Sequence, residues 1–220
     1  MPYSSRFGDH FYSRNDGRAE CAHVFINGNR LDERFGQAGI LQIGETGFGT
    51  GLNFVETWRQ WKSLAPDGAR LGFTSFEKYP MQKNQIARAL AHWPEVEEEA
   101  SALLAAWPDK PESDISIAFG PVQLDVLLGN AEERLRDWKN KADAWFLDGF
   151  APSRNPDMWS IELMFEIAAH SSDMATLSTY SAAGWVRRNL KAAGFTVEKR
   201  PGFIGKRDMT IGRLDNPKPL

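Results

Sequence analysis

Residues 40–51 read Ile40-Leu41-Gln42-Ile43-Gly44-Glu45-Thr46-Gly47-Phe48-Gly49-Thr50-Gly51, and this stretch decides the fold. Its first part is mostly apolar and predicts a short buried strand. Three glycines then stand at alternate positions, and the apolar residues that follow recur at roughly helical spacing, at Leu52, Val55, Trp58 and Trp61. The sequence therefore predicts a strand, a glycine-rich turn and a helix.

The glycine-rich turn predicts a ligand site. Closely spaced glycines permit positive φ angles and let a ligand lie against the backbone, because no Cβ stands in the way. A dinucleotide fingerprint would need glycine at position 52, where this chain has Leu52. Glu45 ends the strand, where its carboxylate can take the amino group of an amino-acid-like ligand. The spacing favours S-adenosylmethionine over NAD, although such a turn on its own can also be only a tight connection.

Composition is typical of one soluble α/β domain. The chain has 220 residues, of which 42% are apolar, enough for an ordinary buried core. No stretch approaches the about 18 apolar residues of a membrane span, and the N-terminus lacks the apolar run of a signal peptide, so we expect a cytoplasmic protein. The single cysteine, Cys21, excludes an intrachain disulfide, and the four histidines show no metal-ligand spacing. No metal is expected.

Basic charge is concentrated at the C-terminal end. Residues 187–220 contain nine basic and three acidic side chains, which gives this region a charge of +6. Because the net charge of the whole chain is −3, residues 1–186 carry a charge of −9. Such a region is either an ordinary solvated surface or a local phosphate-binding surface on an otherwise acidic protein.

Seven strands are predicted, at residues 40–44, 71–76, 122–128, 144–147, 174–180, 195–199 and 209–214. Residues 1–36 form a separate extension before a main domain of residues 37–220. Within the extension, Asn27-Gly28 between the apolar run 24–26 and residues 29–31 predicts a tight β-hairpin. Aromatic and polar residues before that hairpin, such as Phe7 and Phe11, either cover the ligand site or pack against the domain.

Polar side chains stand at the ends of the predicted strands. Glu77 ends the second strand, where a carboxylate can accept both ribose hydroxyls of an adenosine. Asn130 follows the third strand and either contacts an adenine edge or caps the next helix. Asp148 ends the fourth strand and begins a stiff loop that contains two prolines. Because ligands bind at the carboxyl ends of strands in open α/β sheets, we expect Asp148 and the glycine turn to share one crevice.

Together these residues resemble the methyltransferase domain of the bifunctional tRNA 5-methylaminomethyl-2-thiouridine biosynthesis proteins. The resemblance covers nearly the whole chain and is carried by residues 12–13, 45–54, 75–78, 143–152, 155–159 and 206–209. It implies a class I, Rossmann-like fold whose seven-stranded, mostly parallel sheet has one antiparallel strand. It also implies methyl transfer from S-adenosyl-L-methionine to the 5-aminomethyl group of the tRNA wobble (2-thio)uridine, which gives 5-methylaminomethyl-2-thiouridine.

The resemblance also implies roles for individual residues. Those expected to bind the cofactor are Glu45, Gly47, Gly49, Gly51, Asn53, Glu77, Lys78, Asn130, Ala131 and Asp148. Asp148 is expected to orient the amine by hydrogen bonding and to pass its proton to water. Phe150 and Trp159 either flank the flipped uracil ring or pack within their loop. The side chains expected to meet phosphates of the tRNA anticodon arm are Arg187, Arg188, Lys206 and Arg207.

Many relatives carry a flavin-dependent oxidase domain that supplies the amine. The chain ends at Leu220, which leaves no room for that domain, so we expect either a stand-alone methyltransferase or half of a longer protein. One alternative is an N-methyltransferase for a small-molecule amine, which would not need the basic C-terminal region. An NAD-dependent oxidoreductase is disfavoured by Leu52, and a non-catalytic tRNA-binding subunit is disfavoured by the presence of Glu45, Glu77 and Asp148 together.

Overall fold

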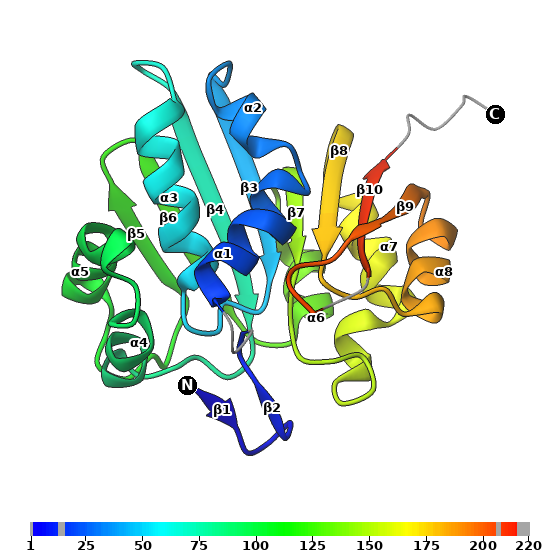
Figure 1. Ribbon diagram of the computed structural model, residues 1–220, viewed down its shortest axis with the longest axis horizontal. Helices are drawn as coiled ribbons and strands as arrows, with labels where there is room; N and C mark the ends of the chain where they lie inside the picture. The colour runs from blue at the N-terminus through cyan, green and yellow to red at the C-terminus, as the bar shows by residue number, and fades with distance from the viewer. Residues whose placement is uncertain (1, 13–15, 206–207, 215–220) are drawn as a thin grey trace.

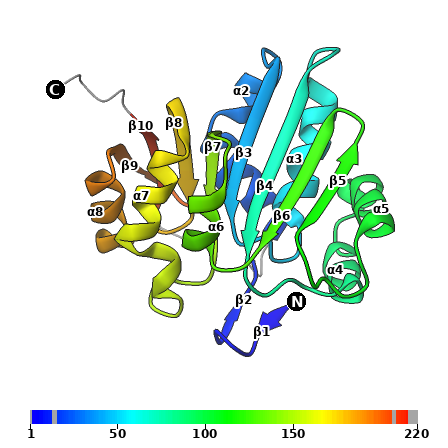
Figure 2. The same cartoon turned by 180° about the vertical axis from the view of Figure 1, so that it is seen from behind.

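An eight-stranded β-sheet forms the centre of the computed structural model, which describes residues 2–12, 16–205 and 208–214 (Figures 1 and 2). The strand order is β5-β6-β4-β3-β7-β8-β10-β9. The strands of this sheet are β3 (Ile40–Thr46), β4 (Arg70–Glu77), β5 (Ile115–Phe119), β6 (Val122–Leu128), β7 (Ala142–Leu147), β8 (Ser171–Thr179), β9 (Phe195–Pro201) and β10 (Asp208–Leu214).

The seven predicted strands are all present, and β5 is an addition. Neighbouring strands from β6 to β8 pair in parallel, whereas β10 runs antiparallel to both β8 and β9. Strand β5 pairs antiparallel with β6 at the sheet edge. Its sequence, Ile115-Ser116-Ile117-Ala118-Phe119, is mostly apolar, but the strand has only five residues and only Ile115 is buried. From β3 the chain first builds one half of the sheet and then returns to β7, which makes β3 and β7 the point where strand order reverses.

Helices cover both faces of the sheet. One face carries α3 (Leu52–Leu64), α4 (Lys83–Leu90), η2 (Pro94–Val96) and α5 (Glu97–Ala106), together with the N-terminal helices (Figure 1). The other face carries α6 (Ala131–Asp137), η3 (Pro156–Trp159), α7 (Ile161–Ala169) and α8 (Gly184–Ala192) (Figure 2). Each face has its own apolar core, and β3 and β7 are buried between the two layers, as expected for central parallel strands.

The predicted hairpin around Asn27-Gly28 is wrong. Residues 17–35 form α1 (Gly17–Cys21), the π-helix η1 (Ala22–Asn27) and α2 (Leu31–Phe35). Gly28 is there for close packing, because a Cβ on it would lie 2.9 Å from Cβ of Ser178. Asn29 is fully buried, and its amide donates to the carbonyls of Phe25 and Trp145 and to the Ser178 hydroxyl. This segment is therefore anchored in the main core. Gly28 and Asn29, which predicted a turn in the sequence, instead allow close packing and form buried hydrogen bonds.

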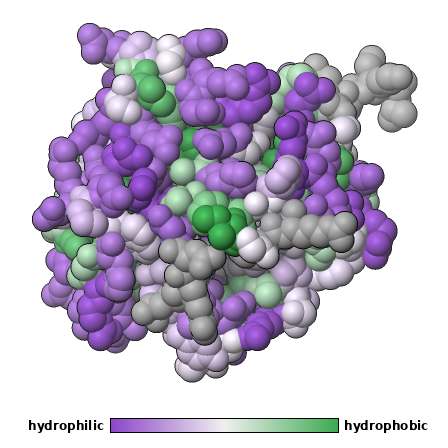
Figure 3. All heavy atoms as spheres, in the orientation of Figure 1, coloured by the Kyte–Doolittle hydropathy of each residue, from purple (hydrophilic) through white to green (hydrophobic). Residues whose placement is uncertain are grey.

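A hairpin does occur earlier in the chain. Strands β1 (Tyr3–Ser4) and β2 (Asp9–His10) pair antiparallel and project at the carboxyl edge of the central strands (Figures 1 and 2). The face that carries α1 and α3 is mostly hydrophilic, with small separate apolar patches (Figure 3). Across the described residues, no helix has the length and apolarity that a membrane crossing requires.

Candidate active site

The glycine-rich turn leads from β3 into α3. Gly47, Gly49 and Gly51 have φ angles of 85°, 53° and 75°, in the left-handed region that favours glycine. The amide of Gly49 donates to Oε2 of Glu77 at 3.0 Å, so the turn is held by the carboxylate that ends the neighbouring strand. The backbone at Gly47 is open, because a Cβ there would have its nearest neighbour at 3.8 Å. At Gly47 the turn thus offers bare backbone to a ligand, whereas Phe48 and Leu103 fill the space beside Gly51.

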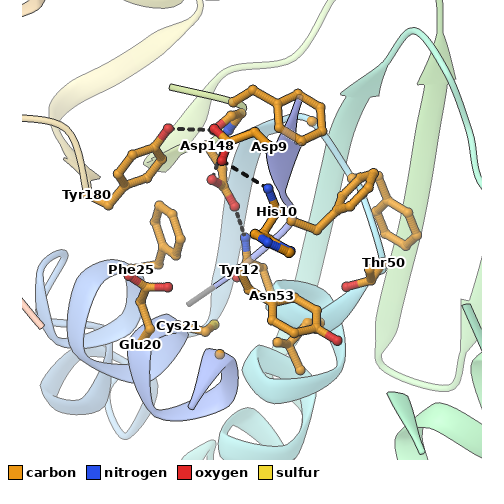
Figure 4. A pocket seen from close by; sticks show the side chains of 18 of the residues that line it. Asp9, His10, Tyr12, Glu20, Cys21, Phe25, Thr50, Asn53, Asp148 and Tyr180 are labelled. Atoms are coloured by element: carbon orange, nitrogen blue, oxygen red, sulfur yellow. Dashed lines mark hydrogen bonds between the residues drawn. The ribbon is translucent and has the colours of Figure 1, made fainter. Parts of the chain in front are cut away.

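A cavity of about 450 Å³ lies between this turn, Asp148, the N-terminal hairpin and α1 (Figure 4). Its volume is within the range of small-molecule sites. The side chains labelled around it come from segments far apart in the sequence, and they are Asp9, His10, Tyr12, Glu20, Cys21, Phe25, Thr50, Asn53, Asp148 and Tyr180 (Figure 4). The structure thus confirms the predicted shared crevice of Asp148 and the glycine turn.

Asn53 connects two carboxylates of the site. Its amide donates to Oε1 of Glu45 and to Oδ2 of Asp148, each at 2.9 Å, and Oδ1 of Asp148 accepts from the amide of Gly149. Glu45 is fully buried beneath Asn53 and is not among the residues that line the cavity. Burial raises the pKa of Glu45 to about 8, an effect that hydrogen bonds from Ser75 and Asn53 oppose. Glu45 therefore does not line the cavity itself and is linked to it only by its hydrogen bond with Asn53.

Two further groups beside Asp148 stay protonated at neutral pH. The Tyr180 hydroxyl donates to the carbonyl of Gly149 at 2.7 Å, and burial, with the nearby charge of Asp148, raises its pKa. Burial likewise raises the pKa of the Cys21 thiol, and the charges of Glu56, Glu45 and Asp148 add to the effect. Neither group is a base or a nucleophile at pH 7.

Glu20 is a site residue that the sequence did not single out. It lies on α1, is only 7% exposed, and lines the cavity together with Asp148 and Asp9 (Figure 4). Its charge contributes to the raised pKa of Tyr180. In the sequence, Glu20 is one acidic residue beside an apolar run, and only the packing of α1 against the site shows its position. The cavity consequently has carboxylates on several sides.

A second cavity, of about 690 Å³, lies along the ends of β4 and β6. It is lined by Glu77, Lys78, Asn130 and Ala131, which were predicted to bind the cofactor. The Asn130 side chain caps α6, since its oxygen accepts from the amides of Glu132 and Glu133. Helix capping is thus confirmed, and the same side chain also borders the cavity.

Phe150 borders both cavities. Its ring stacks on Phe7, with centroids 4.5 Å apart, and meets Phe11 edge to face at 5.0 Å. The N-terminal hairpin therefore packs on the Asp148 loop, as the second alternative for these aromatic residues predicted, and it also borders both cavities.

The predicted stacking of Trp159 on a flipped base is wrong. Trp159 is fully buried, and its indole N–H donates to the carbonyl of Phe150 at 3.0 Å. Its apolar bulk fills the core beneath the loop, which leaves no ring face for a ligand. Arg187 is half-buried and Arg188 exposed on α8, outside both cavities. Lys206 and Arg207 lie outside the described residues.

Within residues 2–12, 16–205 and 208–214, no group of three or more His, Cys, Asp or Glu side chains is arranged to hold a metal ion.

Comparison with known proteins identifies the class of enzyme. Residues 94–215 match the model of a family of S-adenosyl-L-methionine-dependent methyltransferases, and the chain belongs to this family. The predicted class I methyltransferase fold and the predicted cofactor, S-adenosyl-L-methionine, are thereby confirmed. The open glycine turn and the Glu77 carboxylate at the strand end fit such a cofactor.

Within this class, the chain is similar to the tRNA 5-methylaminomethyl-2-thiouridine biosynthesis bifunctional protein MnmC. The chain is 47% identical to MnmC of Chromohalobacter salexigens over 98% of its length, and 48% identical to MnmC of Pseudomonas aeruginosa over 99%. It covers 32% and 34% of those proteins, so it spans about a third of the curated relatives it matches. The crystal structure of MnmC2 from Aquifex aeolicus superposes with a TM-score of 0.81 at 26% identity, covering 97% of this chain and 67% of that one.

Proposed function

We propose that this protein transfers a methyl group from S-adenosyl-L-methionine to the 5-aminomethyl group of the wobble (2-thio)uridine in tRNA, giving 5-methylaminomethyl-2-thiouridine. The observation that carries the proposal is the match to MnmC proteins over essentially the whole chain. The acidic cavity beside the glycine turn supports it, because a primary amine is cationic at neutral pH and suits a wall that contains Glu20, Asp148 and Asp9.

The cofactor would lie across both cavities. Its methionine part would rest on Gly47 and Gly49 and contact Asn53, while Glu77, Lys78, Asn130 and Ala131 would hold its adenosine part. Gly51, which was also predicted to bind the cofactor, borders neither cavity. Glu45 would act on its amino group through Asn53, which bridges Glu45 and Asp148. When bound, the cofactor supplies an electrophilic methyl group on a sulfonium.

The residues of the chain would position the amine and remove its proton. An alkylammonium has a lysine-like pKa of about 10, so its neutral form costs roughly 4 kcal/mol at pH 7. Asp148 would accept a hydrogen bond from the ammonium and pass one proton to water, which leaves a nitrogen lone pair directed at the methyl carbon. Tyr180 and Cys21 hold their own protons and would shape the site without titrating. Phe150 would border the target base.

We infer two partners. The first is the tRNA anticodon arm, for which Arg187, Arg188, Lys206 and Arg207 remain the phosphate-binding residues predicted from the sequence. The second is a flavin-dependent oxidase domain or protein that supplies the aminomethyl group, because the matching relatives are named as bifunctional. A tRNA substrate would place the reaction in the cytoplasm.

One labelling experiment tests the proposal. The purified chain is mixed with methyl-labelled S-adenosyl-L-methionine and tRNA from cells that lack this methylation, and the tRNA is then digested to nucleosides. Label in 5-methylaminomethyl-2-thiouridine is the expected result. Cofactor binding without any labelled tRNA would contradict the tRNA substrate and favour the alternative, a small-molecule amine.

A further inference from the structure

Exposed cationic and aromatic side chains surround the turn of the N-terminal hairpin. We call them the hairpin patch, and they are Tyr3, Arg6, Lys78, Tyr79 and Arg154. The two tyrosines are unusually open for aromatic residues, at 56% exposed for Tyr3 and 43% for Tyr79. Four of the five line the rim of the second cavity, all but Arg154. The patch therefore adjoins the proposed cofactor site, and Lys78 belongs to both.

Three segments distant in sequence bring these side chains together. The Arg6 guanidinium lies 4.1 Å from the centroid of the Tyr79 ring, and Nζ of Lys78 lies 5.7 Å from the same ring. On the other side of the turn, the Arg154 guanidinium lies against Gly8, since a Cβ there would be 3.1 Å from Nη1. Arg6, Lys78 and Arg154 thus converge on one turn.

The cations of the hairpin patch, Arg6, Lys78 and Arg154, form no ion pair with any carboxylate of the described residues. A guanidinium stacked on an aromatic ring keeps its N–H donors free for a planar or tetrahedral anion. Positive side chains interleaved with open aromatic rings are the combination that binds single-stranded nucleic acid, because phosphates meet the charges and bases stack on the rings.

The second cavity also has exposed acidic lining residues, Asp157 on η3 and Glu162 on α7. A polyanion that approaches the cavity is repelled by these two carboxylates and attracted to the cations of the hairpin patch. The distribution of charge therefore favours contact between an RNA strand and the patch.

We propose that the hairpin patch binds the unpaired nucleotides that flank the target base in an RNA loop. This rests on the proposed function, in which the target is a wobble uridine in the single-stranded part of the anticodon arm. Arg6 and Arg154 would contact backbone phosphates, and Tyr3 would stack on a neighbouring base. The predicted basic residues of the C-terminal region would form one contact surface for the RNA. The hairpin patch would form a second contact surface, next to the proposed cofactor site.

The test compares two double variants that remove the same charge. Arg6→Gln/Arg154→Gln removes two cations of the patch. Arg70→Gln/Lys141→Gln removes two exposed cations at the amino ends of β4 and β7, the edge of the sheet opposite the site. Binding of a fluorescent RNA stem–loop with the anticodon-arm sequence is measured at several salt concentrations, S-adenosyl-L-methionine binding is measured by calorimetry, and methyl transfer to tRNA is assayed with the wild type.

The patch variant is expected to bind the stem–loop roughly tenfold more weakly, with a salt dependence shallower by about 1.4 because two phosphate contacts are lost. Its cofactor affinity should match the wild type, and the control should bind RNA normally. Equal losses in both double variants, or a loss of cofactor affinity alone, would overturn the proposal. If the patch variant binds RNA normally and the wild type methylates tRNA, the proposed RNA binding by the patch is refuted and the proposed function stands. A wild type that neither binds the stem–loop nor labels tRNA would overturn both.

Discussion

Replacing Glu45 by glutamine should remove a large pH dependence of stability. Glu45 is fully buried, and its pKa rises from an ordinary 4.5 to about 8, chiefly through burial. Between these two values the folded protein keeps the proton and the unfolded chain releases it. The free energy of unfolding therefore falls as pH rises through this window and becomes constant above about pH 8. Glutamine has the same shape and no proton to exchange.

The size of the effect follows from the two pKa values. A pKa that moves from 4.5 to about 8 corresponds to about 5 kcal/mol over the whole window, or about 1.4 kcal/mol for each pH step of one. The Glu45→Gln variant should consequently gain stability relative to the wild type by about 3 to 5 kcal/mol between pH 5 and pH 8. Other groups titrate alike in both proteins, so they cancel in the difference.

Urea unfolding of both proteins at pH 5, 6, 7 and 8 measures this difference. Glu56→Gln is the matched control, because Glu56 is equally buried but accepts hydrogen bonds from Arg18 and Arg59. Removing this buried carboxylate from the partly exposed Arg18 and Arg59 should destabilise the control by about 1 to 3 kcal/mol. A difference between Glu45→Gln and the wild type that stays constant from pH 5 to pH 8 would show that Glu45 is already ionised in the folded protein, and the reasoning would fail.

Three further substitutions test the site. Asp148→Asn should lower kcat by about 100-fold or more with little change in cofactor Kd, measured by labelled methyl transfer and calorimetry; near-normal turnover would exclude the role of Asp148. Gly49→Ala should cost about 1 to 2 kcal/mol of stability, because φ is 53° and the added Cβ would lie 3.2 Å from the Phe11 ring; an unchanged urea midpoint would contradict this. Trp159→Phe should lower stability by about 1 to 3 kcal/mol by leaving the Phe150 carbonyl unbonded, and a loss of RNA affinity in the folded variant would restore the stacking role.

The parallel strands, the glycine turn and the place of Asp148 were predictable because they depend on local signals. Buried parallel strands need continuous apolar runs, and the turn needs positive φ angles that glycine adopts at little cost. Once β3 and β7 were recognised, the carboxyl ends of neighbouring strands had to meet. The crevice between Gly47 and Asp148 follows from topology alone.

The N-terminal region could not be predicted in the same way, because its residue types serve tertiary contacts. Val24, Phe25 and Ile26 have high strand propensity, yet the core against which they pack favours a helix there. The sequence predicts a turn at Asn29, whereas its amide satisfies buried acceptors on β7 and β8. Glu20 enters the site only through this helical packing, so no local pattern indicated it.

The acidic cavity has a chemical consequence for the proposed reaction. Carboxylates at Glu20, Asp148 and Asp9 would bind a substrate ammonium well, but they also stabilise its charged form and raise its pKa above the lysine-like value near about 10. At saturating tRNA, the rate should therefore rise about tenfold for each pH step from about 6 to 9, without a plateau. Glu20→Gln should weaken tRNA binding roughly tenfold and shift the pH–rate profile to lower pH, because the amine then loses its proton more readily. A wild-type plateau below about pH 8, or an unshifted profile in Glu20→Gln, would mean that the amine does not bind as a cation facing Glu20.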